Sequence, residues 1–165
     1  MPSIQQTHVE VYVFRREGRR VEFLCMRRCA RGSLPGTWQP VTGKRRAGER
    51  AVAAARREVF EETGLRPLRL WALETVTIYF DPAADVVRLL PLFAAEIGRR
   101  DTVALSREHD AFRFLGARAA GNRFLWEAQR RGLEAVRREV LARPMLARAL
   151  EVSRAARHLT RTRPE

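Results

Sequence analysis

The stretch "GKRRAGERAVAAARREVFEETGL", which runs from Gly43 to Leu65, decides how the rest of the chain is interpreted. It holds four glutamates, and three of them crowd together near its end, although the chain as a whole carries a net charge of +13. Like charges packed this closely repel one another, so the pattern needs either a compensating partner or full solvation.

The composition of this stretch predicts a helix over residues 49–63 that ends at Gly64, because glycine commonly follows the last residue of a helix. On that helix Glu58, Glu61 and Glu62 share one face, since they are three and four positions apart. A neighbouring apolar face, expected to pack on a sheet, is formed by Val52, Ala55 and Val59.

The position of the three glutamates is unfavourable unless something binds them. Carboxylates in the last turn face the negative end of the helix dipole, which costs roughly 0.3–1 kcal/mol each. A divalent cation reverses the sign of this energy, and a cluster of oxygen ligands on a rigid element suits Mg²⁺ or Mn²⁺. The alternative is an acidic helix face that is simply solvated and held by neighbouring arginines. Helical spacing alone leaves both interpretations open.

The wider pattern favours the metal. Gly43 is followed by five residues, Glu49, seven residues, and then the run Arg57–Leu65, "REVFEETGL". This arrangement resembles the Nudix box, G-x5-E-x7-R-E-U-x-E-E-x-G-U with U aliphatic, at every defined position. The resemblance extends over about residues 8–140, where a predicted hairpin and the segment "WQPVTG" precede the box and "REHDAFRFL" follows it.

The resemblance implies a fold, a reaction and a cofactor. Nudix proteins are α/β/α sandwiches with a mixed sheet and a loop–helix–loop box, so the expected fold class is α/β. Their enzymes hydrolyse a nucleoside diphosphate linked to another group, using water as the nucleophile and a divalent cation, here Mg²⁺ with Mn²⁺ as the alternative. The expected metal ligands are the backbone carbonyl of Gly43 and the carboxylates of Glu58, Glu61, Glu62 and Glu108.

The same resemblance implies the catalytic residues, which are Arg57, Glu58, Glu61 and Glu108. Arg57 would hold the glutamates in position, and Glu49 would support the loop–helix geometry. The general base would be either a glutamate of the box or Glu108, whose neighbourhood resembles an "EH-x-x-[FY]" segment of family members that act on nucleoside or pterin triphosphates. A solvated loop acid is the alternative for Glu108, and His109 beside it is expected to be structural.

Candidate substrate-binding residues lie around the box. Arg27 and Arg28 end a predicted strand, and strand alternation allows only one of them to reach a substrate phosphate. Arg88 interrupts an apolar strand and is a further candidate. Trp38 and Gln39 could stack on a base and read its polar edge, although Trp38 could instead pack under the loop. "WQPVTG" resembles the corresponding segment of dihydroneopterin triphosphate and dATP pyrophosphohydrolases.

The remaining elements are predicted from periodicity and turn residues. Strands are expected over residues 8–14, 21–28, 67–80 (as one strand or two), 86–97 and 111–115, with Pro91 marking a sheet edge or a bulge. Helices are expected over residues 119–141 and 145–157. A domain over residues 1–143 and an extension over 144–165, helical or disordered, complete the organisation, and the last six residues are expected to be disordered.

Composition and sequence patterns indicate where in the cell the protein is expected to work. No apolar run approaches the length of a membrane span, no signal peptide is visible, and Cys25 and Cys29 fit neither a zinc site nor a disulfide framework, so a cytoplasmic protein is expected. The excess of arginine either favours phosphate-bearing partners or reflects a solvated basic surface.

Three functions remain open at this stage. The favoured one is hydrolysis of a nucleoside or pterin triphosphate, a small-molecule partner. The second is hydrolysis of a dinucleoside polyphosphate or an RNA 5′ end, with RNA the less favoured partner. The third is a non-catalytic nucleotide-binding module, against which the complete box argues. Apolar residues after Arg143 leave room for a homodimer.

Overall fold

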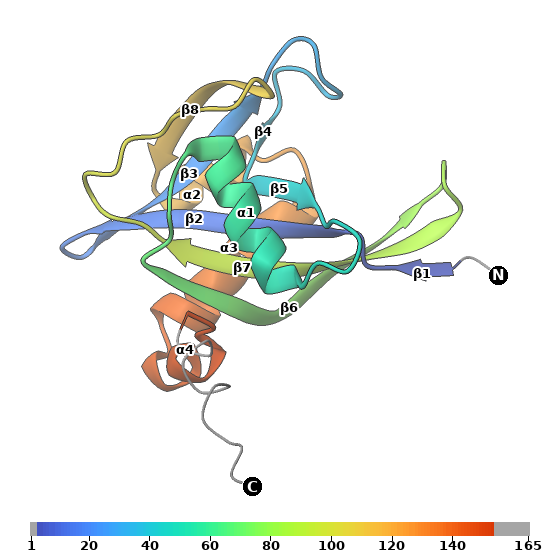
Figure 1. Ribbon diagram of the computed structural model, residues 1–165. Helices are drawn as coiled ribbons and strands as arrows, with labels where there is room; N and C mark the ends of the chain where they lie inside the picture. Colours follow the sequence, from blue (N-terminus) through green and yellow to red (C-terminus); the bar gives the residue numbers. More distant parts are fainter. Residues whose placement is uncertain (1–2, 154–165) are drawn as a thin grey trace, which may run out of the picture.

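One eight-stranded sheet organises residues 3–153, the part of the chain that this computed structural model describes (Figure 1). The strands are β1 (Ser3–Gln5), β2 (His8–Glu17), β3 (Arg20–Arg28), β4 (Trp38–Gln39), β5 (Val41–Lys44), β6 (Arg69–Asp81), β7 (Val86–Glu96) and β8 (His109–Leu115). The helices are α1 (Ala51–Thr63), α2 (Ala117–Arg123), α3 (Glu127–Val136) and α4 (Pro144–Leu150), with the π-helical segment η1 (Arg137–Leu141) after α3.

The sheet is mixed and forks near its middle. β7 runs parallel to β1 and β2 and antiparallel to β6. β2 and β3 form the predicted hairpin, and their pairing ends where Phe14 lies opposite Phe23. Beyond that point β5 takes the place of β3 beside β2, and β4 takes the place of β2 beside β3. The fork therefore brings the ends of β3, β4 and β5 next to the start of the box.

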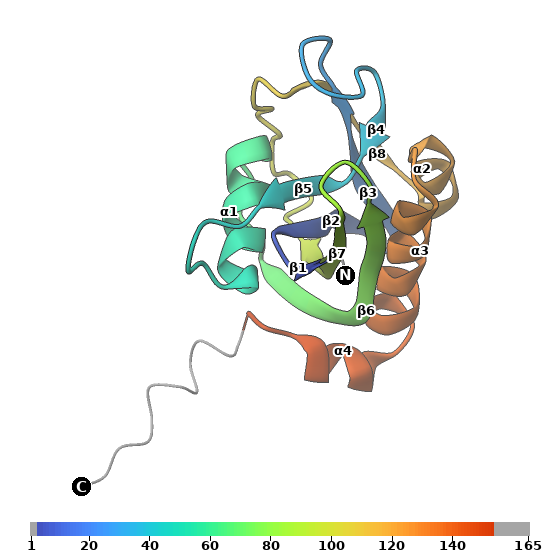
Figure 2. The same cartoon turned by 90° about the vertical axis from the view of Figure 1, so that its right-hand side faces the viewer.

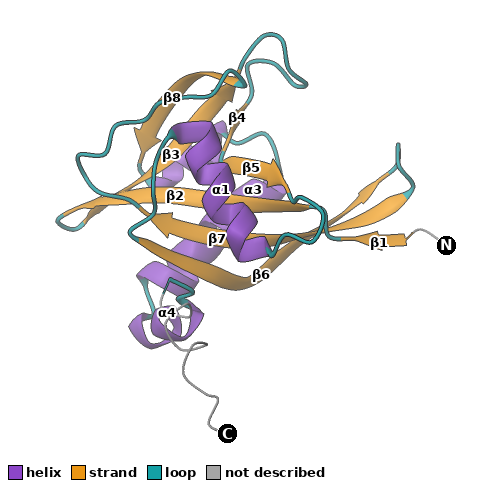
Figure 3. Ribbon diagram, in the orientation of Figure 1, coloured by secondary structure: helices purple, strands orange, loops and turns teal. Residues whose placement is uncertain are grey.

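Helices cover both faces of the sheet, as Figures 2 and 3 show, with α1 on one side and α2 and α3 on the other. The predicted α/β/α sandwich is therefore confirmed. None of the helices within residues 3–153 is long and apolar enough to span a bilayer. Each face has its own core: Ala55 and Val59 pack with Val9 and Val11 on the α1 side, and Leu133 packs around Trp71 on the other.

The helix predicted over residues 119–141 is wrong as a single element. The structure replaces it with α2, α3 and η1, because Phe124 and Trp126 adopt extended backbone conformations between α2 and α3. Phe124 is 3% exposed and packs into the core, where it forms an isolated bridge with Trp38. Burial of this aromatic side chain explains why the chain leaves the helix there.

The helix predicted over residues 145–157 is also shorter than expected. α4 begins at Pro144, a favourable first helical residue, and ends at Leu150. Glu151 is extended because it bridges to Trp71 and its carboxylate lies 2.7 Å from Arg69 Nη2. Residues 154–157 and the last six residues lie outside the described part of the chain, and the domain boundary at Arg143 stays a prediction.

Pro91 marks a bulge and not a sheet edge, since β7 is paired on both sides. The register of β6 on β7 shifts between Ala72 and Val76, and Val76 lies opposite Pro91. The buried carboxylate of Glu139 accepts hydrogen bonds from the backbone N–H of Glu74 (2.9 Å) and the hydroxyl of Thr75 (2.5 Å). The η1 segment thus satisfies polar groups that the bulge removes from the ladder.

A second buried carboxyl lies on the opposite face of the sheet from α1. Glu10 is 5% exposed, and burial raises its pKa to about 7. The Tyr12 hydroxyl contacts the Glu10 carboxyl and also lies 3.0 Å from the backbone carbonyl of Gln129. One hydroxyl proton cannot serve both acceptors, so a protonated Glu10 completes the chain from carboxyl to tyrosine to carbonyl. A Cβ at Gly132 would lie 2.1 Å from the Tyr12 oxygen, which explains the glycine.

We expect Glu10→Gln to reduce the pH dependence of folding. Below about pH 4.5 the carboxyl is protonated in both folded and unfolded chains, whereas between 4.5 and 7 only the folded chain keeps the proton, so stability falls as pH rises. The shift corresponds to about 3 kcal/mol at most, and glutamine removes it. Urea unfolding from pH 4.5 to 7.5 measures the difference, with the exposed Glu127→Gln as control. Parallel curves for wild type and Glu10→Gln would contradict the assignment.

Candidate active site

Arg57 gathers the acidic residues of the box around one guanidinium. Its Nη1 donates to Glu58 (2.7 Å) and Glu61 (2.8 Å). Its Nε and Nη2 donate to the two carboxylate oxygens of Glu49, each at 2.8 Å, and Nη2 also reaches the carbonyl of Lys44. Arg57 and Glu61 are four positions apart on α1, which allows their contact. One planar cation thereby ties the loop before α1 to the last turns of that helix.

Glu49 binds the loop from Arg45 to Arg50 through its side chain. One Glu49 carboxylate oxygen accepts the backbone N–H of Arg46 at 2.9 Å, and both oxygens accept from Arg57. These bonds lower the Glu49 pKa to about 2, so the carboxylate is charged at every pH at which the protein would be studied.

Gly43 is required by the close approach of Glu58 to β5. A Cβ added to Gly43 would lie 1.8 Å from Glu58 Cδ, which no side-chain adjustment of a few tenths of an ångström can relieve. Gly43 lies opposite Val9 on β2, so its strand cannot retreat without breaking the ladder. The first glycine of the box therefore makes the space into which the Glu58 carboxylate is folded.

Glu62 is the most deeply buried acid of the cluster, at 4% exposed. Burial, together with the charges of Glu58 and Glu108, raises its pKa to about 9 against the opposing effect of Arg28. Its Oε2 has no hydrogen-bond partner within the described residues. A buried carboxyl oxygen without a partner is costly, so Glu62 lacks something that the site is built to receive.

Glu108 joins this cluster from the loop before β8, since its charge acts on both Glu58 and Glu62. The predicted grouping of a box glutamate with Glu108 therefore exists in space. Burial, followed by the neighbouring charges of Glu61 and Glu108, also raises the pKa of Glu58, although the contacts with Arg57 oppose this. The carboxylates repel one another as they stand, which is the electrostatic condition that a cation relieves.

A chain of side chains connects the end of β3 to Glu62. Arg28 Nη1 donates to Gln39 Oε1 (3.3 Å), and Gln39 Nε2 lies 3.2 Å from His109 Nε2. Since Arg28 can only donate, the Gln39 amide nitrogen must face the histidine, whose Nε2 is then the acceptor. The ring proton of neutral His109 therefore sits on Nδ1, which lies 4.0 Å from the unpartnered Glu62 Oε2. Burial lowers the His109 pKa and favours this neutral form.

The other predicted substrate-binding residues, Arg27, Trp38 and Arg88, contact other parts of the molecule. Arg27 turns away from Arg28, as strand alternation requires, and its Nε bonds Asp110 at 2.6 Å. Trp38 is half-buried against the core on the α2 side, with the Arg123 guanidinium over its ring at 5.0 Å. Arg88 is bonded to Asp81, Gln5 and Thr7 on the far end of β7, so the structure does not bring it into the carboxylate cluster.

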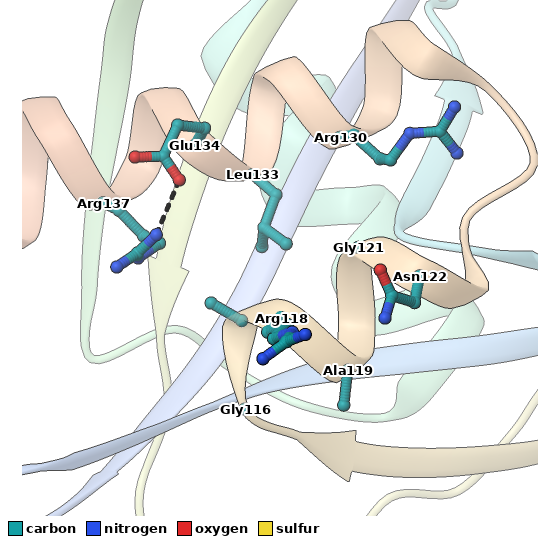
Figure 4. Close-up of a pocket in the computed structure, with 10 residues that line it drawn as sticks. Gly116, Arg118, Ala119, Gly121, Asn122, Arg130, Leu133, Glu134 and Arg137 are labelled. Atoms are coloured by element: carbon teal, nitrogen blue, oxygen red, sulfur yellow. Dashed lines mark hydrogen bonds and ion pairs between the residues drawn. The ribbon is translucent and has the colours of Figure 1, made fainter.

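Sequence reasoning missed Arg46, whose Nη2 donates to Glu61 Oε1 at 2.8 Å. The basic run before Glu49 was the available signal. The groove between α2 and α3, shown in Figure 4, is a separate feature with Arg118, Arg130 and Arg137 along it. It lies on the other face of the sheet from α1, and no predicted site residue lines it.

The donor set fits a hard divalent cation. Carboxylate oxygens of Glu58, Glu61, Glu62 and Glu108 are grouped beside the β5 backbone at Gly43, and oxygen-only donors suit Mg²⁺ or Mn²⁺. Within residues 3–153 no three acidic, histidine or cysteine side chains enclose a metal as they stand, and Arg57 binds Glu58 and Glu61.

Comparison with known proteins agrees with the geometry. Residues 5–142 match the model of the NUDIX domain, so the chain belongs to the Nudix family. This family includes hydrolases that act on pyrophosphate bonds of nucleotide-like substrates.

Two solved structures of similar fold share about a fifth of their residues with this chain. An Ap4A hydrolase of Caenorhabditis elegans is 21% identical, with a TM-score of 0.67, and the match covers 79% of this chain and 94% of the other. The Escherichia coli dihydroneopterin triphosphate pyrophosphohydrolase is 20% identical, with a TM-score of 0.64, and the match covers 81% of this chain and 96% of the other. An octanoyltransferase of Myxococcus xanthus is 32% identical over 74% of this chain, and the match covers about a third (34%) of that protein.

We expect Gly43→Ala to destabilise the protein and to expel the Glu58 carboxylate. The added methyl group cannot coexist with Glu58 Cδ at 1.8 Å, and overpacking of this kind costs about 1–3 kcal/mol. Chemical denaturation measures the loss, and Mg²⁺-dependent thermal stabilisation should shrink with it. Gly116→Ala is the matched control, because nothing lies within 4 Å of a Cβ there. Equal stability of the two variants would contradict the close approach.

We expect Gln39→Glu to change the protonation of His109. A carboxylate at position 39 still accepts from Arg28 but can only accept from His109, so His109 Nε2 must carry a proton, either in the other neutral tautomer or in the imidazolium. Long-range ¹H–¹⁵N NMR correlations distinguish these forms from the wild-type tautomer. Gln5→Glu makes the same chemical change far from the site. An unchanged His109 spectrum in Gln39→Glu would contradict the arrangement.

Proposed function

We propose that this protein is a metal-dependent hydrolase that cleaves the pyrophosphate linkage of a nucleoside or pterin triphosphate, or of a related nucleoside diphosphate derivative, by attack of water. The observation that carries the proposal is the unpartnered, buried Glu62 oxygen beside Glu58 and Glu108. A merely structural acidic face would be solvated, whereas Glu58 and Glu62 are buried and their pKa values are raised by burial and by neighbouring carboxylates.

The proposed metal ligands are the Gly43 carbonyl and the carboxylates of Glu58, Glu61, Glu62 and Glu108, with Mg²⁺ preferred and Mn²⁺ as the alternative. The bound cation would neutralise phosphate oxygens and lower the pKa of a water molecule. Arg57 keeps Glu58 and Glu61 in place through its charge-assisted bonds. Glu62 must lose its proton to become a ligand, and the Nδ1–H of His109 faces the oxygen on which negative charge then appears.

Arg28 is the proposed phosphate-binding arginine. Its charge already acts on Glu62, so its guanidinium lies close enough to the cluster to contact a substrate phosphate. Gln39 holds Arg28 and could read a base or pterin edge, with Trp38 contributing an aromatic wall. Arg28 has only neutral partners, Ser33 and Gln39, whereas Arg27 and Arg88, the other candidates for this task, form ion pairs with Asp110 and Asp81.

Proton removal from the attacking water is proposed for Glu61 or Glu108. Glu61 has a 44% exposed side chain and is held by Arg57 and Arg46. Glu108 lies directly before β8, and its charge acts on Glu58 and Glu62. Variants of the two residues separate them: the base shows a loss of kcat with little change in KM.

The proposed place of action is the cytoplasm, in keeping with the free thiols of Cys25 and Cys29. The second candidate substrate class, a dinucleoside polyphosphate or RNA 5′ end, is favoured by the net charge of +13 alone. RNA cleavage predicts a steep loss of activity with salt, whereas a small nucleotide predicts a weak one.

We expect metal-dependent turnover of one substrate class, lost about 100-fold or more in Glu62→Gln, because the neutral amide cannot become a charged ligand. Phosphate and pyrophosphate release would be measured on nucleoside triphosphates, dihydroneopterin triphosphate, dinucleoside polyphosphates, ADP-ribose and 5′-triphosphorylated RNA, with Mg²⁺, Mn²⁺ or chelator. At pH 7 Glu62→Gln should fold with nearly wild-type stability, since Glu62 is protonated there without metal.

The control for this experiment is Glu127→Gln, an exposed change on α3. Full activity of Glu62→Gln would remove Glu62 from the metal site. Absence of turnover with every substrate, together with retained nucleotide binding, would instead support the non-catalytic module.

A further inference from the structure

A groove of about 810 Å³ runs between α2 and α3, on the face of the sheet that is turned away from α1 (Figures 2 and 4). Leu133 points from α3 toward α2. A Cβ added to Gly121 would lie 3.6 Å from the Leu133 side chain, so the two helices pack against each other there. The groove is separate from the glutamate cluster, because none of the proposed metal ligands lines it.

Positive charge is arranged along this groove. Arg118 on α2, Arg130 on α3 and Arg137 at the start of η1 line it, and Glu134 is the one acid among the described residues that do so. In Figure 4 Arg130 and Arg137 lie toward opposite ends of the groove, with Arg118 between them. The three guanidinium groups therefore form a row of positive charge, which is suited to a linear anion.

The acids of this part of the chain do not balance its arginines. Residues 113–143 contain eight arginines, three glutamates and no aspartate. Each glutamate forms an ion pair at 2.7–2.8 Å with one nearby arginine: Glu127 with Arg130, Glu134 with Arg137, and Glu139 with Arg138. Within the part of the chain that the structure describes, Arg118 and Arg131 form no ion pair, so a bound anion would find unbalanced positive charge there.

An exposed aromatic side chain adjoins the arginines at the start of α3. Trp126 directly precedes this helix and is 55% exposed. The Arg130 guanidinium is held beside the same turn, because its Nη1 donates to the carbonyl of Phe124 at 2.9 Å. Aromatic rings beside a basic groove are typical of surfaces that bind single-stranded nucleic acids, since bases stack on the ring while cations contact the phosphates.

We propose that the groove between α2 and α3, together with Trp126, binds single-stranded nucleic acid at a site separate from the box. Arginine suits this task because its planar fork matches two phosphate oxygens and keeps its charge at every accessible pH. The net charge of +13 attracts a polyanion to the protein, and the row of arginines determines where the strand lies. An acidic protein segment would account for the arginines but not for the exposed ring beside them.

The test is binding of labelled uridine and deoxyuridine oligomers, each about 12 nucleotides long with a 5′-hydroxyl end, to the full chain. Fluorescence anisotropy would be measured with a chelator present. Without metal or 5′ phosphates, binding does not depend on the proposed hydrolysis, so either proposal can fail without the other. We expect both oligomers to bind and their affinity to fall steeply with salt, because each phosphate contact releases counterions.

The double variant Arg118→Gln/Arg137→Gln should raise the dissociation constant about 10-fold at low salt and flatten the salt dependence. Its matched control is Arg66→Gln/Arg99→Gln, which removes the same charge outside the groove. Arg66 lies over the Phe60 ring, and Arg99 pairs with Glu17 as Arg137 pairs with Glu134. The control should lose about twofold at most, since it changes only the net charge.

Trp126→Leu separates stacking from charge. It should weaken binding of both oligomers about 10-fold but leave binding of inorganic polyphosphate unchanged, because polyphosphate has no bases to stack. The double arginine variant should weaken binding of both kinds of polymer. Circular dichroism would verify that each variant is folded, which is expected because Trp126 and the two arginines are exposed.

Four results would overturn the proposal. Absence of oligomer binding at low salt would remove the site. Equal losses in the groove variant and in its control would show that only net charge matters. A larger loss in Arg28→Gln than in Arg118→Gln would place the oligomer at the box. Tighter binding of polyglutamate than of either oligomer would point to an acidic protein partner instead.

Discussion

The guanidinium of Arg57 is the contact on which the site depends. It stands 2.7–2.8 Å from the carboxylates of Glu49, Glu58 and Glu61, two of which lie in the second half of α1 and would otherwise repel each other. Its bonds raise its own pKa, so this cation is permanent. Because one of its partners is Glu49 in the preceding loop, Arg57 also determines how the chain enters α1, and therefore where Gly43 and β5 lie relative to Glu58.

The acids of the box are chemically the same but are given different protonation states by their surroundings. Arg57 and a backbone N–H hold Glu49 ionised, with a pKa of about 2, whereas burial and neighbouring charges bring that of Glu62 to about 9. At neutral pH the cluster therefore carries less charge than its formula suggests. Protonation of Glu62 lowers the repulsion among the carboxylates in the protein without a cation. The Glu62 carboxyl can still lose its proton when a cation binds.

Local sequence rules predicted what local physics controls. Helical spacing located the glutamate face, and Gly64, with a φ of 70° at the C-cap, ends α1 as expected of a glycine. The errors arose where distant contacts decide the backbone: burial of Phe124 interrupts a helical pattern, and Glu139 reaches across to the β6 bulge. The arrangement of Arg28, Gln39 and His109 depends on three separate strands, so neither its order nor the histidine tautomer could be read from spacing.

Arginine contacts link the site to the start of β7. Many arginines form local ion pairs, such as Arg88 with Asp81 and Arg57 with its glutamates, and these pairs stabilise the local structure. The Thr7 hydroxyl accepts a hydrogen bond from Arg88, and the Thr7 carbonyl accepts one from the backbone N–H of Arg45 in the glutamate loop. The start of β7 and the loop before α1 are therefore joined by one continuous set of contacts.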